Sequence, residues 1–475
     1  MAQFFTIGEK KTRPGVYYRY ENYGTPPTAG ADDGKCAAVI RSNWGPVGEV
    51  QEMDSYEDIA KIYGDGGTGG TTDVALEEFK GGATKVFAIR LGTGGTKGTY
   101  TIKDDDSTPA NVITLTLKHP GTRAFTVTIR PTVADNTLTE LILYEGTVEL
   151  EKLTFSNATD SVAALMAEYA DKGSEYFTLT KLADSTHALA SVSQASITPG
   201  TDPTITNQSY SDAFEALEPY RWNVLAIDTE TTAVHALMQL YLERIYQGGK
   251  FAMGVVGEPT SVALATRMSH ATAFNSYQLV YVGNGFIDSE GNTKEGYRAA
   301  ARIAGLIAGT PSNESITHLA ISGAVDLSEA LTNSQYESAI KAGMLTFSKS
   351  AAGAVWVEQG INTLVTPGTK EDDGWKKIKR AKVRFELFQR LNDSVEGLVG
   401  RINNDADGRM TVVQVGNNVC NEMIAEKKLM AGAYVELDPN YTPQGDSAWF
   451  IVYADDIDAL EKLYFAFKFR FAPED

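Results

Sequence analysis

Residues that could perform acid–base or nucleophilic chemistry are spread thinly through the sequence. The five histidines fall in separate segments, and neither an HExxH nor a G-x-S-x-G pattern occurs. Such patterns matter because they hold a base, a nucleophile or a metal ligand at a fixed distance from its partner. We therefore expect no catalytic residue, no metal ligand and no enzymatic activity. The histidines are interpreted as surface or packing residues: His119, His187, His235, His270 and His318.

Two glycine-rich stretches could in principle cradle a phosphate. Residues 64–69 match G-x-G-x-x-G, but a dinucleotide-binding loop must follow a strand, and the preceding segment is helical in pattern. Residues 92–99 carry a lysine among glycines without the order of a P-loop. The first stretch is interpreted as a helix–helix loop and the second as a flexible hinge. No cofactor is expected.

An acidic turn near the C-terminus has the beginning of a calcium loop. Asn403, Asp405, Asp407 and Gly408 occupy its positions one, three, five and six, but position twelve is Gln414. The bidentate glutamate that closes such a loop is missing, so a polar turn between helices is the favoured interpretation.

Composition narrows the classes of protein further. The 475 residues include 42 Lys and Arg against 61 Asp and Glu, a net charge of −19, which disfavours general nucleic-acid binding. The two cysteines, Cys36 and Cys420, exclude a disulfide framework and a zinc ribbon. The first residues lack a signal-peptide pattern, and the longest apolar stretch, near 303–308, is too short to span a membrane. We expect a protein that is made and used in a cytoplasm, without membrane insertion.

The elements that would position any site follow an α/β rhythm in two separated regions. Apolar strands alternate with helical patterns from 37 to 91 and again from 222 to 321, which is typical of a parallel sheet covered by helices. Between them, short Thr- and Val-rich strands predict a small β-rich domain with one helix at 161–170. Because insertions are tolerated at exposed loops, we expect this block to project outward from one core domain. Its boundaries, 92–98 and 199–203, should then lie close together.

The final region is predicted to combine a strand, two helices and a terminal strand. Residues 381–388 alternate apolar and charged side chains, which indicates a half-buried strand, and helices are predicted at 394–401 and 411–430. The strongest strand pattern in the chain ends the sequence. Its alternating apolar residues are Leu463, Phe465, Phe467, Phe469 and Phe471.

The first 24 residues do not resemble part of a compact domain. Residues 16–20 form an extended run after Pro14-Gly15, and prolines follow at 26 and 27. A frayed terminus is one interpretation. The five aromatic residues in this short stretch instead favour an arm that buries itself on a partner: Phe4, Phe5, Tyr17, Tyr18 and Tyr20.

Positive charge is concentrated in two segments of this acidic chain. Residues 376–390 carry a net charge of +6 and residues 1–20 carry +3, which leaves −28 on the remainder. The basic stretch is interpreted either as a solvated face or as a surface that meets acidic regions of other copies or of a partner.

Five short motifs, in this order, resemble the contractile phage tail-sheath family, which includes sheaths of defective prophages and phage-tail-like bacteriocins. They are the arm motif RPGVY at 13–17, the turn NWGPVG at 43–48, the strand GGATKVFAIR at 81–90, the turn RINNDADGR at 401–409, and the ending IDALEKLY at 457–464. The resemblance spans nearly the whole chain, except the β-rich block, where no motif is found.

The resemblance implies an α/β and α+β multidomain fold. Its parts would be an N-terminal linker arm (1–24), a core α/β domain (25–93 plus 203–350), an inserted β-rich domain (94–202), a tube-proximal C-terminal α/β domain (351–460) and a C-terminal strand or arm (461–475). Terminal strands with no evident hairpin partner suit addition to a neighbouring sheet. The expected linkage residues are Val16, Tyr17, Tyr18, Tyr20, Leu463, Phe465, Phe467, Phe469 and Phe471.

The function that the resemblance implies is that of a structural subunit, in stacked hexameric rings around an inner tail tube, that contracts to drive the tube through a cell envelope. Its partners would be other copies, the tail tube protein, and baseplate and tail terminator proteins, in a virion tail or tail-like particle assembled in a bacterial cytoplasm. The tube-facing candidates are Arg401, Arg409, Lys427 and Lys428. The alternative is an α/β enzyme or ligand-binding protein that uses the glycine-rich loops.

Overall fold

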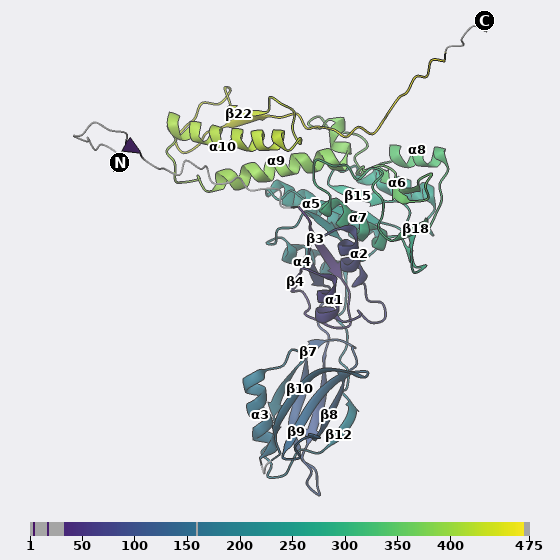
Figure 1. The fold of residues 1–475 in the computed structure, drawn as a ribbon, viewed down its shortest axis with the longest axis vertical. Helices are drawn as coiled ribbons and strands as arrows, with labels where there is room; N and C mark the ends of the chain where they lie inside the picture. The colour runs from purple at the N-terminus through teal and green to yellow at the C-terminus, as the bar shows by residue number, and fades with distance from the viewer. Residues whose placement is uncertain (1–2, 5–16, 19–32, 158–159, 470–475) are drawn as a thin grey trace. The chain divides into compact units, whose positions relative to one another are not determined.

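The computed structural model describes residues 3–4, 17–18, 33–157 and 160–469 (Figure 1). The described chain divides into two compact units. One contains residues 386–455, and the other contains residues 33–385 together with 456–469. The predicted domain boundaries stay predictions, and the two units are described separately below.

The larger unit is built on a seven-stranded sheet with the order β19-β15-β14-β13-β3-β5-β4. All neighbours are parallel except the edge pair β4–β5. The sheet therefore joins strands from both predicted α/β regions, since β13 pairs directly with β3. Its strands are β3 (Lys35–Ile40), β4 (Val50–Met53), β5 (Lys85–Arg90), β13 (Val224–Ala226), β14 (Met253–Gly257), β15 (Leu279–Val282) and β19 (Met344–Leu345).

Helices follow most of these strands, as the α/β rhythm predicts. The closest helix pair is α2 with α7, and a Cβ at Gly305 would lie 2.0 Å from the Glu78 carbonyl oxygen. Only glycine allows that approach, and α7, which also packs on β3, β13, β14 and β15, is almost wholly buried. The helices are α1 (Tyr56–Tyr63), α2 (Asp73–Gly81), α4 (Asn207–Leu217), α5 (Thr232–Gln247), α6 (Leu264–Phe274), α7 (Tyr297–Gly309) and α8 (Asn333–Lys341).

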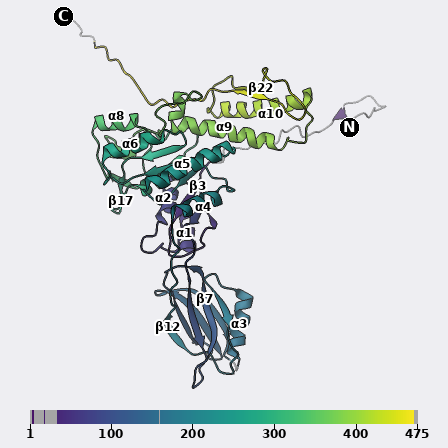
Figure 2. The same ribbon diagram turned by 180° about the vertical axis from the view of Figure 1, so that it is seen from behind.

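The β-rich block forms two sheets of its own, with orders β10-β9-β8-β12 and β11-β7-β6. Helix α3 (Ser161–Lys172) packs against β10, as Figures 1 and 2 show. An apolar core fills the module, including Ile113, Leu141 and Phe177. The strands are β6 (Lys97–Lys103), β7 (Asn111–Pro120), β8 (Thr126–Pro131), β9 (Leu138–Glu145), β10 (Val148–Ser156), β11 (Phe177–Lys181) and β12 (Val192–Ser196).

The two ends of this module lie side by side, as expected for an insertion into one loop. Bridges pair Thr93 with Thr204 and Thr96 with Thr201. The interpretation of 92–99 as a flexible hinge is therefore wrong, because the stretch is paired and runs into β6. Gly95, at a φ of 84°, allows the close approach to the Thr201 carbonyl oxygen, which a Cβ would meet at 2.8 Å.

The turn and strand motifs of the core also contact the inserted module. Trp44 is buried in the module's apolar core, with its ring centroid 4.9 Å from that of Phe125. Arg90 is fully buried and donates to the carbonyl oxygens of Ser42 (2.7 Å), Gly45 (2.7 Å) and Pro120 (2.8 Å). These contacts give structural roles to two of the motif residues.

Three further predictions of secondary structure need correction. Residues 381–388 are not a strand but part of helix α9 (Ile378–Glu396), since Lys, Arg, Leu, Gln and Glu favour a helix and no Gly or Pro interrupts them. Apolar and charged side chains alternate over residues 381–388 because α9 buries every second residue of this stretch. The helix predicted at 394–401 ends at residue 396 and is followed by turns, and residues 318–321, predicted to be the last strand of the second α/β region, hold only an isolated bridge at Ala320.

The smaller unit contains the end of α9, helix α10 (Ala406–Ala425) and a hairpin of β22 (Tyr434–Leu437) and β23 (Phe450–Tyr453). Asp405 caps α10 by accepting from the Gly408 backbone N–H at 2.8 Å, which confirms the polar turn between helices.

The remaining elements are short. They are β1 (Gln3–Phe4), β2 (Tyr17–Tyr18), β16 (Phe286–Asp288), β17 (Thr293–Lys294), β18 (Ala324–Leu327), β20 (Phe347–Lys349), β21 (Val355–Val357) and η1 (Asp373–Lys376). No helix in the described ranges is long and apolar enough to cross a bilayer.

Candidate subunit-linking surfaces

The end of the described chain exposes an unusual amount of apolar surface. Leu463, Phe465, Phe467 and Phe469 are 64–85% exposed, and the segment is drawn in Figure 1 without a strand arrow. The predicted terminal strand is thus not formed within this chain, because none of its described residues pairs with another strand. Phe471 lies outside the described residues. Burying one Phe is worth about 1.5–3 kcal/mol, so this segment has much to gain from a partner.

The N-terminal linkage candidates are described only in part. Tyr17 and Tyr18 form β2, which pairs in parallel with β1 through Gln3↔Tyr17 and Phe4↔Tyr18. The expected extended conformation is present at these two residues. Val16 and Tyr20 lie outside the described residues.

The β22–β23 hairpin has two unlike edges. The Asp438 N–H donates to the Trp449 carbonyl oxygen at 2.9 Å, so these two residues form a hydrogen-bonded pair. Hydrogen-bonded and non-hydrogen-bonded pairs alternate along an antiparallel ladder. The pairs Val435↔Val452 and Leu437↔Phe450 are therefore the ones without mutual hydrogen bonds. Their backbone groups point outward. On β22, Asn417 accepts from the Val435 N–H at 2.8 Å and donates to its carbonyl at 3.4 Å.

The edge of β23 lacks such a cover in the described part of the chain. The outward backbone groups of Phe450 and Val452 have no hydrogen-bond partner there. The broad face beside this edge carries Tyr434 and Tyr453, stacked with ring centroids 4.9 Å apart and both exposed. An unpaired edge beside exposed aromatic residues is suited to accept a further strand.

The four tube-facing candidates differ in what they present. Arg401 and Lys427 are exposed. Arg409 donates to the Asn404 carbonyl and side-chain oxygens at 2.8 and 3.0 Å. Lys428 is 5% exposed, and its Nζ lies 2.7 Å from both Glu386 and Glu426. Lys428 therefore contributes to folding of this unit, and a charge reversal there would disturb more than a surface.

Most cations of the basic stretch 376–390 are paired with carboxylates of the same chain. Lys376 pairs with Asp373 at 2.9 Å, and Arg390 pairs with Glu386 at 2.5 Å and with Glu426 at 2.7 Å. Between them, Lys377, Arg380 and Arg384 bind the acidic residues that follow position 455. These acidic partners were not predicted from the sequence, although the DDIDALE pattern at 455–461 offers the complementary charge.

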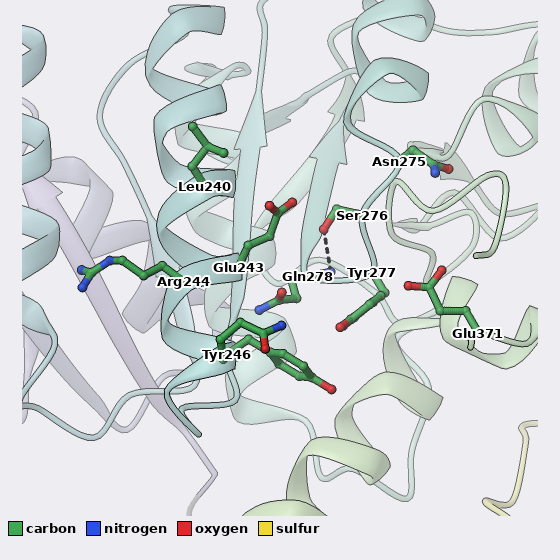
Figure 3. Close-up of a pocket in the computed structure, with 10 residues that line it drawn as sticks. Leu240, Glu243, Arg244, Tyr246, Asn275, Ser276, Tyr277, Gln278 and Glu371 are labelled. Atoms are coloured by element: carbon green, nitrogen blue, oxygen red, sulfur yellow. Dashed lines mark hydrogen bonds between the residues drawn. The ribbon is translucent and has the colours of Figure 1, made fainter. Parts of the chain in front are cut away.

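The larger unit also has an open pocket of about 500 Å³, shown in Figure 3. Glu243 and Arg244 of α5 line one side, and Ser276, Tyr277 and Glu371 line another. Burial, and next a hydrogen bond with Tyr246, raise the pKa of Tyr277. Arg244 is paired with Glu218 at 2.7 Å.

The ten residues that line the pocket include no histidine or cysteine. Residues 64–69 connect α1 and α2, as the helix–helix interpretation predicts. Among the described residues, no group of three or more His, Cys, Asp or Glu side chains could hold a metal ion.

Comparison with known proteins agrees with this architecture. The family model of the phage tail sheath protein central domain matches residues 204–363. Two proteins of Bacillus subtilis (strain 168), the uncharacterized protein YqbK and the phage-like element PBSX protein XkdK, are each 24% identical to the chain over 404 and 405 residues, which is 83% of this chain and 82% of each relative.

A solved structure shares the fold over nearly the whole length. The sheath tail protein of Desulfitobacterium hafniense superposes with a TM-score of 0.72 at 21% identity, covering 93% of this chain and 100% of that one. The mixed α/β multidomain fold predicted from the sequence is confirmed. The family-model match over residues 204–363 and the shared fold both support the tail-sheath family that the five motifs resemble.

Proposed function

We propose that this protein is the structural subunit of a contractile tail sheath and has no enzymatic activity. Copies would polymerise as stacked hexameric rings around an inner tail tube and contract to drive the tube through a target envelope. The observation that carries the proposal is the terminal segment 463–469, whose alternating apolar side chains are exposed in the single chain. A monomer gains nothing from such a segment, whereas a polymer can bury it.

The hairpin supplies an acceptor for that segment. A strand from a second copy, added along β23, would satisfy the outward backbone groups of Phe450 and Val452. Its apolar side chains would meet hairpin residues such as Tyr453 across the new strand pair, a kind of pairing that stabilises sheets. Strand addition gives strength through backbone hydrogen bonds, and the alternating side chains give specificity.

Contraction in this proposal is a rigid-body rearrangement of subunits that remain tied by their arms. A second link between subunits would come from the N-terminal residues Val16, Tyr17, Tyr18 and Tyr20. The tube, baseplate and terminator proteins would be the other partners, and assembly would take place in the host cytoplasm of a phage or of a tail-like particle.

The test is the size and shape of the purified full-length chain. Negative-stain microscopy and sedimentation at rising protein concentration should show rings and tubes. A chain that stays a small compact oligomer at all concentrations, with or without the tail tube protein, would contradict the sheath proposal.

A further inference from the structure

The acidic stretch after residue 455 is bound to the first turns of α9. Asp456 receives hydrogen bonds from Arg380 Nη2 at 3.1 Å and from Arg384 Nη2 at 2.8 Å, and Arg380 Nε also donates to it. Lys377 Nζ lies 2.8 Å from Asp458 and 3.1 Å from Glu461. We call these six residues the arm clamp: Lys377, Arg380, Arg384, Asp456, Asp458 and Glu461.

Glu461 closes the clamp with further neutral partners. Its carboxylate accepts from Thr317 Oγ1 at 2.9 Å, from Ser315 Oγ at 3.2 Å and from Gln359 Nε2 at 3.3 Å. The side chains of Asp456 and Glu461 are only 5% and 9% exposed. Such shielded, multiply bonded pairs are stronger than isolated surface ion pairs, which are worth about 0–1 kcal/mol.

Exposure is continuous after Glu461, since every described residue from 462 to 469 is exposed, whereas residues 456–461 mix half-buried and exposed side chains. Leu463 is 64% exposed and Phe465 is 75% exposed, and neither pairs with another described strand. Among the described residues, Glu461 is therefore the last with a side-chain hydrogen bond or ion pair, and the exposed segment begins at Lys462.

We propose that the arm clamp anchors the C-terminal arm to the unit of residues 33–385 and makes Lys462 its pivot. The mechanical role of the arm clamp rests on the proposed sheath function. When a neighbouring copy holds the arm, tension passes through Glu461 and Asp456 into α9 and the Thr317 loop. In the copy that donates the arm, all six residues of the clamp belong to this unit, so the tension enters it directly; in the copy that holds the arm, the β22–β23 hairpin bears the tension.

The carboxylates of the arm clamp are ionised at neutral pH, as ion pairs that hold the arm at that pH require. Burial works to raise the pKa of Asp456, but hydrogen bonds from Arg380 and Arg384 outweigh it, and the pKa is lowered overall. The pKa of Glu461 is lowered in the same way, because Lys377 and Thr317 outweigh its burial. Both carboxylates therefore stay charged until the solution is strongly acidic.

Distances between spin labels test the anchor in the isolated full-length chain. Cys36 and Cys420 are buried, so cysteines introduced as Leu319→Cys with Leu460→Cys, or with Phe467→Cys, can be labelled selectively. The 319–460 distance distribution should be narrow and the 319–467 distribution broad. In Asp456→Asn/Glu461→Gln, the width of the 319–460 distribution should at least double. A 319–460 distribution as broad as 319–467 in the unmodified clamp would overturn the anchor.

A matched variant controls for general loss of ion pairs. Asp326→Asn/Glu218→Gln removes two exposed pairs of the same unit, with Lys349 at 3.0 Å and Arg244 at 2.7 Å. It should leave both distributions unchanged. If the clamp double variant fails to fold, Glu461→Gln alone, which keeps its neutral partners, should still broaden the 319–460 distribution. An unchanged distribution in that folded variant would count against the clamp.

Assembled sheaths test the path of tension. Tubes of the clamp variant should break into short pieces when contraction is triggered by urea at neutral pH, whereas tubes of the control variant should contract intact. Intact contraction of tubes of the clamp variant would contradict the proposed path of tension. If the full-length chain forms no tubes while the 319–460 distribution stays narrow, the sheath proposal fails and the anchor remains.

Discussion

Asn417 covers one edge of the hairpin by hydrogen bonding to both backbone groups of Val435, at 2.8 Å to its N–H and 3.4 Å to its carbonyl. The side-chain amide thus takes the place of a neighbouring strand on β22. Close packing supports it, because a Cβ at Gly416 would lie 2.7 Å from Val435 Cγ2. On β23, by contrast, neither outward residue, Phe450 nor Val452, has such a partner among the described residues.

Replacing Asn417 with Ala should expose the β22 edge and destabilise the protein. A buried backbone group that loses its partner costs about 1–3 kcal/mol, and urea unfolding should show a loss of that size. Asn418→Ala, on the same helix, is the control and should change stability by less than about 0.5 kcal/mol. Equal effects of the two substitutions would mean that Asn417 does not act as an edge cover.

Glu78 should make the protein less stable as pH rises. It is fully buried, neither carboxylate oxygen has a hydrogen-bond partner in the described residues, and burial raises its pKa well above the usual value. The folded state therefore keeps a proton that the unfolded state releases. Stability should fall as pH rises from the unfolded pKa, near 4.5, toward the raised folded pKa.

Glu78→Gln should remove that pH dependence and match or exceed wild-type stability at pH 8, measured by thermal unfolding between pH 5 and pH 8. The adjacent Glu77→Gln is the control, because Glu77 is paired with Arg302 at 2.5 Å. It should destabilise by about 3–5 kcal/mol, the usual cost of breaking a buried pair. A Glu78→Gln protein with the wild-type pH profile would show that Glu78 is ionised in the folded state.

Trp44 should hold the inserted module firmly to its surroundings. Its ring contacts Phe125 and also His119, at centroid distances of 4.9 and 5.1 Å. Trp44→Ala should cost about 3–5 kcal/mol in urea unfolding, as for other buried aromatic residues. Trp449→Ala, which removes a partly exposed Trp, is the control and should cost much less. A similar small loss in both would contradict the role given to Trp44.

The sequence was most informative where local chemistry decides the structure. The capping box of Ser55 and Asp58 begins α1, and buried apolar runs such as β3 form the centre of the sheet, both in the first region where an α/β pattern is predicted, 37–91. These features depend on neighbours in sequence, so one chain suffices to predict them.

Predictions failed where a residue that is distant in the sequence determines the local structure. Residues 381–388 alternate in burial because α9 is packed on more than one side, which no local pattern distinguishes from a strand. The hairpin edges depend on Asn417, eighteen residues before Val435, and the arm clamp joins Lys377 to Asp458 across 81 positions. Spacing within the sequence carries no signal for such contacts.

Charge reversal tests the proposed contact with the tail tube. Arg401→Glu/Lys427→Glu changes two exposed cations and leaves the buried Lys428 pair intact. Tube-templated assembly should weaken, because a polar, charged contact allows the sheath to grip and then slide. Lys103→Glu/Lys172→Glu, in the inserted module, should have a smaller effect. Equal assembly by both variants, or a basic outer surface on the tube, would contradict the electrostatic contact.

Removing the C-terminal arm tests the central claim most directly. A chain ending at Lys462 keeps the arm clamp and loses residues 463–475, including four exposed apolar side chains. Because those side chains contact nothing that folding requires, the truncated protein should unfold at the same temperature as the full chain. Negative-stain microscopy should show tubes from the full-length protein and only monomers from the truncated one. Normal tubes from the truncated protein would contradict linkage through the C-terminal arm.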